Sequence, residues 1–232
     1  MNTEKFAIPF AIIIAGGIIG GALYFSNIKA ASVAKGANQA PTAQQAAVGD
    51  MRKVTSDDHI LGNPNADVVI VEYSDTECPY CKMFQTTMKQ VIANYGTNGK
   101  VAWVYRNFPI DSLHSKSRKE AEATECAAEL GGQAKFWEFI NGVYDKTPSN
   151  NGLDPAQLPI IATSIGLDTA AFNSCLSSGR YAPKVEADYQ DGVKAGATGT
   201  PHSVIITKDG KTPIDGAKTY DQMKTIIDAL LK

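Results

Sequence analysis

The alternation of hydrophobic and polar positions predicts a strand, a helix and a second strand from residue 68 onward. Val68–Tyr73 is a continuous β-branched run bounded by turn residues, which is typical of a buried central strand. Val101–Phe108 is predicted to be a second strand. The amphipathic helix between them ends at Gly96, and its apolar face consists of Phe84, Met88, Val91 and Tyr95. Such a βαβ unit implies two parallel strands joined by a right-handed crossover.

The middle of the chain, about residues 112–195, shows no strand pattern and is predicted to be helical. The expected helices are Ser115–Leu130, Lys135–Tyr144, Asp154–Ile165 and Thr169–Leu176. A strand returns at Ser203–Thr207, followed by a hairpin turn at Lys208–Lys211 and a closing amphipathic helix that reaches Leu230. The predicted fold class is therefore α/β, with an all-helical block inserted between a β-α-β half and a β-β-α half.

The amino-terminal segment Phe6–Phe25 carries no charge over 20 residues. At about 1.5 Å per residue, a helix of that length spans about 30 Å, the hydrocarbon thickness of a bilayer. The apolar region of a cleaved signal peptide is only about 7–15 residues long. We therefore expect residues 1–29 to be a single-pass transmembrane anchor; a signal peptide cleaved near Ser32–Ala34 is the alternative. Lysines on both sides of the segment leave its orientation undecided by charge.

Residues 30–53 are rich in Ala, Gln, Ser and Gly and lack the large apolar side chains that a core needs. They are predicted to be a flexible linker to a folded domain at 54–232, whose α/β halves are expected at about 54–111 and 196–232. The whole chain has 22 basic and 24 acidic residues, a net charge of −2. A net charge so close to zero does not indicate binding to nucleic acid.

The tetrapeptide Cys78-Pro79-Tyr80-Cys81 stands between the predicted buried strand and the predicted helix. Pro79 has no N–H and a preset φ, which suits the first turn of a helix. Cys78 then lies where free backbone N–H groups and the helix dipole favour a negative charge. Such a position lowers the pKa of a thiol from about 8.5 to about 3.5–7.5. Because the thiolate is the reactive form, we predict that Cys78 is the nucleophile and Cys81 the resolving thiol of a redox-active disulfide.

Three other interpretations of this cysteine pair are open: half of a zinc site, a structural disulfide, and a two-thiolate site for a soft metal such as copper. A zinc site needs two more ligands at close spacing, whereas Cys126 and Cys175 are far apart (175 − 126 = 49) and the three histidines are scattered. The strand-to-helix position favours the redox interpretation. We expect no cofactor and no resident metal.

Cys126 and Cys175 lie on separate predicted helices of the inserted block. In a reducing compartment they would be buried free thiols, whereas in an oxidising compartment behind a membrane anchor they are expected to form a disulfide. A disulfide that closes a loop of about 50 residues stabilises the fold by about 4 kcal/mol in the chain-entropy model. The predicted anchor favours the disulfide.

Thr200-Pro201 precedes the predicted strand Ser203–Thr207. A proline at this place removes a donor from the sheet and tolerates a cis peptide bond. A cis turn would leave the backbone of Thr200 free to pair with an extended substrate beside Cys78. An ordinary trans proline at the start of a strand is the alternative interpretation.

From about Asp58 to its carboxyl end, the chain resembles the DsbA-like branch of the thioredoxin superfamily, in particular its membrane-anchored bacterial members. The resemblance rests on several motifs in the same order along the chain. They are His59–Pro64, the VEYSDTECPYC run that ends at Cys81, Arg106–Pro109 with His114, Cys126–Ala128 followed by Phe136-Trp137, Cys175-Leu176 and Gly199–Pro201.

The resemblance implies a thioredoxin-like fold with a helical insert, a cis bond at Pro201 and thiol-disulfide oxidoreductase activity. It implies that substrates contact Pro79, Tyr80, Thr200 and Pro201. It also implies that Glu72 is a buried carboxylate that relays protons to the inner cysteine, whereas an exposed charge at a strand edge is the alternative. Thr76 departs from the aromatic residue that many relatives carry beside the active site.

The resemblance further implies an extracytoplasmic dithiol oxidase that acts on reduced, cysteine-containing secreted proteins. A membrane partner that passes electrons to quinone, of the DsbB or vitamin-K-epoxide-reductase type, would reoxidise it. The direction of exchange stays open, because Pro-Tyr also separates the cysteines of reducing relatives such as glutaredoxins. Asp75 and Glu77 are expected to raise the pKa of Cys78, and Lys82 to lower it. A reductase or isomerase, and a tethered copper- or zinc-binding thiol module, are the alternative functions.

Overall fold

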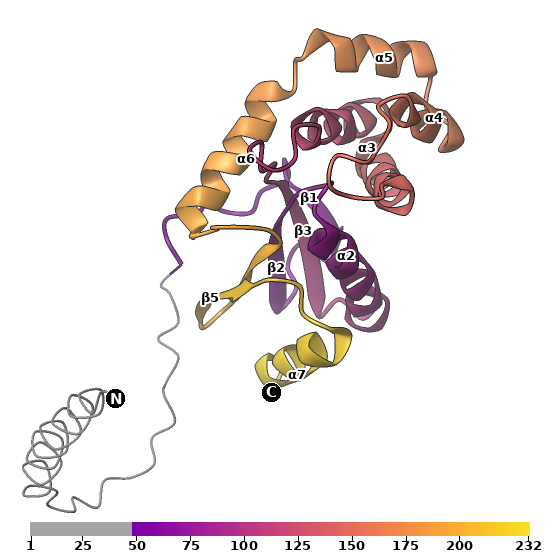
Figure 1. The fold of residues 1–232 in the computed structure, drawn as a ribbon. Coiled ribbons are helices and arrows are strands. Elements are labelled where there is room, and N and C mark those ends of the chain that lie inside the picture. The colour runs from indigo at the N-terminus through magenta and orange to yellow at the C-terminus, as the bar shows by residue number, and fades with distance from the viewer. Residues whose placement is uncertain (1–47) are drawn as a thin grey trace, which may run out of the picture. The chain divides into compact units, whose positions relative to one another are not determined.

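The computed structural model describes residues 48–232, which fold around a five-stranded sheet (Figure 1). The strands follow the order β1-β3-β2-β4-β5 across the sheet. β2 and β3 are parallel, as expected of a βαβ unit, and the other neighbouring pairs are antiparallel. The strands are β1 (His59–Gly62), β2 (Val68–Ser74), β3 (Val101–Asn107), β4 (His202–Thr207) and β5 (Gly210–Asp215).

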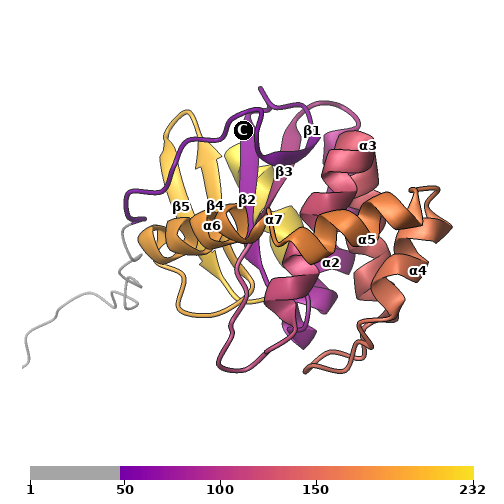
Figure 2. The ribbon, with the colours of Figure 1, turned by 90° about the horizontal axis from the view of Figure 1, so that it is seen from above.

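The helices form two groups, those on the faces of the sheet and those of the insert. On the sheet lie α2 (Pro79–Val91), continued by the π-helical turn η1 (Ile92–Gly96), α6 (Ala182–Ala195) and α7 (Tyr220–Leu230). The insert consists mainly of α3 (Ser117–Lys146), α4 (Gln157–Ser164) and α5 (Thr169–Ser178) (Figure 2). This arrangement confirms the predicted thioredoxin-like α/β fold with a helical insertion.

Alternate residues of the central strand β2 face two different cores. Val68 and Ile70 pack with α2, α7 and the second half of α3, whereas Val71 and Tyr73 pack beneath α6. This alternation follows from the two-residue repeat of a strand. Because β2 is covered on both faces, it reads in sequence as an unbroken apolar run rather than an alternating one. A third core, between α3, α4 and α5, belongs to the insert and includes both Cys126 and Cys175.

Two elements differ from the sequence prediction. β1 was not predicted, because it is a four-residue edge strand whose hydrophobic pattern is too short to be informative. α6 lies within the predicted helical block, but no individual helix was placed there, because its buried face carries Asp188, Asp191 and Gly192 among its members rather than large apolar residues. The two helices expected at 115–130 and 135–144 are joined in α3, which is interrupted only where Gly132 adopts φ 72°.

The predicted boundary between linker and domain is also corrected. Met51 is buried beneath the sheet, and the Arg52 guanidinium binds the Asp188 carboxylate at 2.5 Å. The folded body therefore begins before residue 54, because these contacts tie residues 51–52 to α6. The anchor predicted at 1–29 lies outside the described residues. Within residues 48–232, no helix combines the length and the apolar character that crossing a bilayer requires.

Candidate active site

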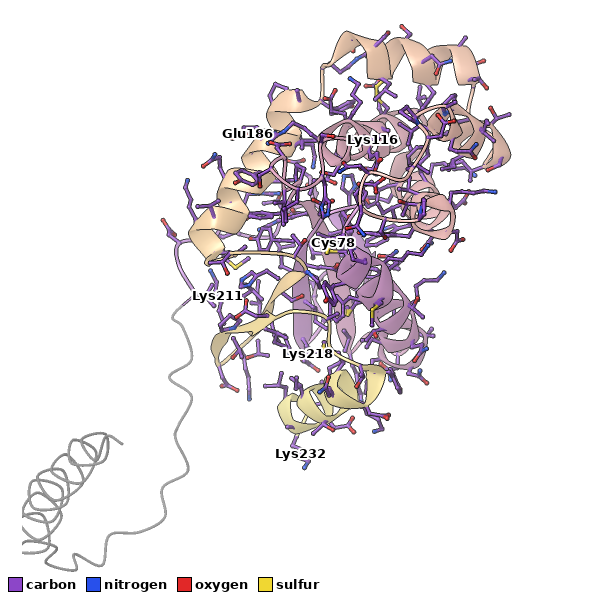
Figure 3. The ribbon with its side chains drawn as sticks, viewed as in Figure 1. Cys78, Lys116, Glu186, Lys211, Lys218 and Lys232 are labelled. Carbon is purple, nitrogen blue, oxygen red and sulfur yellow. A yellow bond between two sulfur atoms is a disulfide. The ribbon has the colours of Figure 1, made fainter. Side chains whose placement is uncertain are left out.

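Cys78 lies at the junction between β2 and α2, where it is the N-cap residue of the helix (Figure 3). Its own backbone is extended, and Pro79 occupies the first helical turn. This local structure follows from the sequence, because a proline fits the first turn, where no N–H partner is required. The Cys78 side chain is buried to 5% exposure, and its Sγ donates to the Thr200 carbonyl oxygen at 3.4 Å.

The surroundings of Cys78 lower its pKa from 9.0 to about 6. A hydrogen bond from the Cys81 thiol contributes most, and burial opposes it. The side-chain hydroxyl of Thr200 and the backbone N–H groups of Cys81 and Tyr80 stabilise the thiolate further. The two backbone donors belong to the first turn of α2, whose N–H groups have no partner within the helix. Cys78 is therefore substantially ionised at neutral pH.

Cys81 is fully buried one turn further along α2, and its environment acts in the opposite direction. Burial raises its pKa well above 9.0, and the hydrogen bond to Cys78 adds to that effect. The Asp75 N–H points to Cys81 Sγ at 3.4 Å. The structure shows both cysteines as free thiols, so the pair consists of a reactive outer thiolate and a protonated inner thiol.

Glu72 lies on β2 on the same face of the sheet as Ile70, and it is completely buried. The alternative of an exposed charge at a strand edge is wrong, because β2 is flanked by β3 and β4. Trp103 Nε1 donates to Glu72 Oε2 at 2.9 Å, while Oε1 has no partner among the described residues. Burial raises the pKa of Glu72 from 4.5 to about 7, so the carboxyl can exchange a proton near neutral pH.

Three buried hydroxyl groups surround this region. Ser74 Oγ lies 3.0 Å from the Tyr144 hydroxyl, which lies 3.1 Å from that of Tyr105. Burial raises the pKa of both tyrosines well above 10. They therefore stay protonated and serve as hydrogen-bond groups rather than as acids in the physiological range. This cluster could not be predicted from the sequence, because its members come from β2, β3 and α3, which lie far apart along the chain.

The peptide bond between Thr200 and Pro201 is cis, and the two residues are placed next to Cys78. The Pro201 carbonyl oxygen accepts a hydrogen bond from the Gly216 N–H at 2.9 Å, which links the turn to the end of β5. The Tyr80 ring, two residues after Cys78 in the first turn of α2, is 61% exposed. The residues predicted to contact substrate thus border the Cys78 sulfur or face solvent beside it.

The charged residues expected to shift the pKa of Cys78 form hydrogen bonds with other groups. Asp75 accepts hydrogen bonds from the N–H groups of Glu77 and Ile110 and from His114 Nδ1, at 2.7–3.0 Å. The Lys82 ammonium donates to the Thr147 carbonyl oxygen at 2.6 Å. Neither residue is among the main causes of the lowered pKa of Cys78. The largest effects on the pKa of Cys78 therefore come from Cys81, burial and Thr200.

The opposite face of the sheet carries a buried ion cluster around Arg106. Its guanidinium is completely buried and donates to the Asp58 carboxylate at 2.8 and 3.0 Å and to Asp191 at 2.6 Å. The Tyr73 hydroxyl donates to the same Asp191 carboxylate. This cluster connects β3 to the segment before β1 and to α6. It is a structural element that sequence reasoning noted only as part of a motif.

Cys126 and Cys175 form a disulfide that links α3 to α5, with their Cα atoms 5.9 Å apart. Both are buried in the insert core and take no part in the Cys78 site. Among residues 48–232, no three His, Cys, Asp or Glu side chains are grouped to hold a metal ion.

The site can be compared with known proteins. Residues 54–229 match the family model described as thioredoxin. DsbA2 of Pseudomonas aeruginosa is 26% identical, with a TM-score of 0.63 over 77% of this chain and 97% of that one. The oxidised BdbD of Bacillus subtilis is 25% identical, with a TM-score of 0.68 over 80% of this chain and 98% of that one.

Curated relatives are much longer proteins. A Na(+)/H(+) antiporter NhaA 1 of a Mycobacterium species (strain KMS) is 31% identical over 162 residues, which are 69% of this chain and 25% of the antiporter. The NhaA 3 antiporter of Salinispora tropica is 32% identical over 144 residues, 62% of this chain and 21% of that protein. The chain therefore spans about a fifth to a quarter of the length of these relatives.

Since the family model covers most of the chain and the similar structures are DsbA proteins, the chain belongs to the thioredoxin family and is a DsbA-like thiol-disulfide oxidoreductase.

Proposed function

We propose that the chain is an extracytoplasmic dithiol oxidase that introduces disulfides into reduced, cysteine-containing secreted proteins. The observation that supports this direction is the stabilised thiolate of Cys78 at the start of α2, with a pKa of about 6. A stabilised thiolate favours the reduced form of the cysteine pair. The reduction potential of the couple is then raised, and the oxidised pair takes electrons from substrate dithiols.

The proposed reaction starts from the Cys78–Cys81 disulfide. A substrate thiolate attacks Cys78 Sγ, a mixed disulfide forms, and the Cys81 sulfur leaves as a thiolate. A second substrate thiolate then attacks the substrate sulfur of the mixed disulfide and releases the Cys78 thiolate. Two electrons pass to the cysteine pair, and the substrate gains one disulfide. Cys78 is a good leaving group in the second step, because its thiolate is already stabilised.

Glu72 is proposed to supply a proton to the Cys81 thiolate when it leaves and to take one back when the pair is reoxidised. Burial, the hydrogen bond to Cys78 and the charges of Cys78 and Glu72 together raise the pKa of Cys81, which makes the buried thiolate a strong base. The pKa of about 7 at Glu72 suits transfer in both directions near neutral pH. Both groups are completely buried, away from bulk water.

Substrate chains are proposed to bind along Thr200 and Pro201 and across the exposed ring of Tyr80. Pro79 would form the adjoining rim beside the sulfur. An extended peptide would hydrogen-bond through its backbone, which gives affinity for many unrelated sequences. Such a mode fits an enzyme that acts on diverse unfolded chains.

The location and the partners complete the proposal. Residues 1–29 would anchor the domain in the cell membrane, with the catalytic part on the periplasmic or outer side. The Cys126–Cys175 disulfide supports an oxidising compartment, because such bonds are rare where thiols are kept reduced. A quinone-linked membrane protein of the DsbB or vitamin-K-epoxide-reductase type would reoxidise the cysteine pair.

The reduction potential of the Cys78–Cys81 couple tests the direction. A value near −120 mV is expected of an oxidase, whereas a value near −270 mV would refute the proposal in favour of a reductase. Refolding of a reduced multi-cysteine substrate should also be lost in Cys78→Ser. Cysteine-dependent binding of copper or zinc without turnover would instead indicate a tethered metal-binding module.

A further inference from the structure

The loop between α3 and α4 contains an unusual run of left-handed backbone beside the active site. Ser149, Asn150 and Asn151 have φ values of 68°, 55° and 65°. Non-glycine residues rarely adopt this conformation, and three in succession persist only where the surroundings hold them in place. Contacts of the segment Thr147–Leu153, here called the 147–153 loop, must therefore maintain it.

Glu77, the residue directly before Cys78, makes three of the hydrogen bonds that hold the 147–153 loop. The Glu77 carboxylate accepts from the Gly152 N–H at 3.1 Å and from the Leu153 N–H at 3.2 Å. The Glu77 carbonyl oxygen accepts from the Asn150 N–H at 2.8 Å. One residue at the start of α2 thus receives three backbone N–H groups of the loop.

A second carboxyl group, that of Glu120 on α3, completes the arrangement. It is buried, its Oε2 accepts from the Thr76 hydroxyl at 2.6 Å, and it hydrogen-bonds to the Glu77 carboxylate. Two carboxyl groups can be hydrogen-bonded to each other only when one carries a proton. Burial and the neighbouring Glu77 raise the pKa of Glu120 to about 8, so Glu120 is the protonated partner and donates to Glu77.

The other charged groups around this pair do not neutralise it. Asp75 adds a negative charge and is itself bound to His114 at 3.0 Å. The ammonium groups of Lys82 and Lys116 donate to carbonyl oxygens at either end of the loop, those of Thr147 and Leu153. Within residues 48–232, neither Glu77 nor Glu120 forms a salt bridge. Loss of the shared proton would leave two adjacent negative charges.

We propose that Glu77 and Glu120 act as a positioning pair for Cys78. The two carboxyl groups share one proton and together clamp the 147–153 loop onto the start of α2. The consequence is that ionisation of Glu120 weakens the clamp. The first turn of α2, whose N–H groups stabilise the Cys78 thiolate, then becomes more mobile. This role concerns the thiolate itself and holds for either direction of disulfide exchange.

Hydrogen exchange of the Gly152 and Leu153 amides in the full chain tests the clamp directly. Protection factors, corrected for the intrinsic rate at each pH, are compared from about pH 6.5 to about pH 9.5. In the wild type they should fall about tenfold across this range, as expected when a hydrogen bond to a charged group is weakened. Glu120→Gln should keep them high throughout, because its amide donates to Glu77 without titrating. Glu120→Ala should show low protection at every pH.

The matched control is Glu122→Gln, on the same helix but paired with Lys119 at 2.9 Å. It should follow the wild-type profile; a flat profile would show that another group is titrating, and the proposal would be wrong. Wild-type protection that does not change with pH, or equal protection in Glu120→Gln and Glu120→Ala, would also overturn it. As a second readout, the pKa of Cys78 should rise in Glu120→Ala and stay at its wild-type value in Glu120→Gln.

Discussion

Glu72 offers a quantitative test of the buried site, because its titration should govern part of the stability of the protein. The carboxyl is completely buried and has one hydrogen bond, from Trp103. Burial raises its pKa from 4.5 to about 7 in the folded protein. The folded state therefore binds this proton more tightly than the unfolded state does. By linkage, the contribution of Glu72 is most favourable below about pH 4.5 and is lost as the pH rises through about 7.

The size of the effect follows from the same values. Each pKa unit corresponds to about 1.4 kcal/mol, so a rise from 4.5 to about 7 makes Glu72 cost about 3 kcal/mol of stability above neutral pH. In Glu72→Gln the oxygen that accepts from Trp103 is retained, and the titration is removed. Relative to the wild type, the variant should gain about 3 kcal/mol in its free energy of unfolding between about pH 4.5 and about pH 8.5.

Urea unfolding of both proteins across this pH range measures the gain. The cysteine pair is kept oxidised so that neither thiol titrates, and taking the difference between the two proteins cancels all other ionisable groups. A difference that changes by less than about 1 kcal/mol would refute the reasoning, because it would mean that water or a partner stabilises the Glu72 carboxylate. The same variant should slow the protonation of Cys81, which appears as slower single-turnover oxidation of a dithiol peptide.

Three further predictions concern other parts of the molecule. Cys81→Ala should raise the pKa of Cys78 above about 6, because it removes the main donor to the thiolate; ultraviolet titration of the thiolate measures this, and an unchanged midpoint would contradict it. Arg106→Met should lower the free energy of unfolding by about 3–5 kcal/mol, since it removes the buried guanidinium that pairs with both Asp58 and Asp191, while the Cys78 titration stays the same. Replacing both Cys126 and Cys175 by alanine should cost about 4 kcal/mol in urea unfolding, and a loss below about 1 kcal/mol would show that the loop they close is already restricted in the unfolded chain.

The accuracy of the sequence predictions differed between elements for identifiable reasons. β2 and α2 were predicted closely, because a buried parallel strand and an amphipathic helix each leave a strong local pattern. α6 was not identified as a separate helix of the predicted helical block, because it buries Asp188 and Asp191 against Arg52 and Arg106, and a helix that buries charges has no apolar stripe. Its stability depends on partners that lie far away in the chain, which no local pattern reveals.

The charges around the active site show the same limit. Asp75, Glu77 and Lys82 are close to Cys78 in sequence, and counting their charges suggested that they tune its pKa. In the folded protein each is bound to a loop or helix that arrives from elsewhere, such as Glu77 to the Gly152 N–H. Glu120 and the hydroxyl cluster of Tyr105 and Tyr144 were not identified, because single acidic and tyrosine residues in a helix or strand carry no signal of their own.

By itself, the sequence determined that a C-x-x-C pair opens a helix directly after a buried strand. This was sufficient to predict that Cys78 is the more acidic of the two thiols, because the N–H groups that stabilise a thiolate there belong to the next few residues. Only the tertiary structure decided that Thr200 meets Cys78, that Glu72 loses its contact with water, and that the buried carboxyl group of Glu120 lies beside Glu77. The physical reason is that pKa shifts of buried groups depend on the exclusion of water and on partners brought together by the fold, which a linear pattern does not contain.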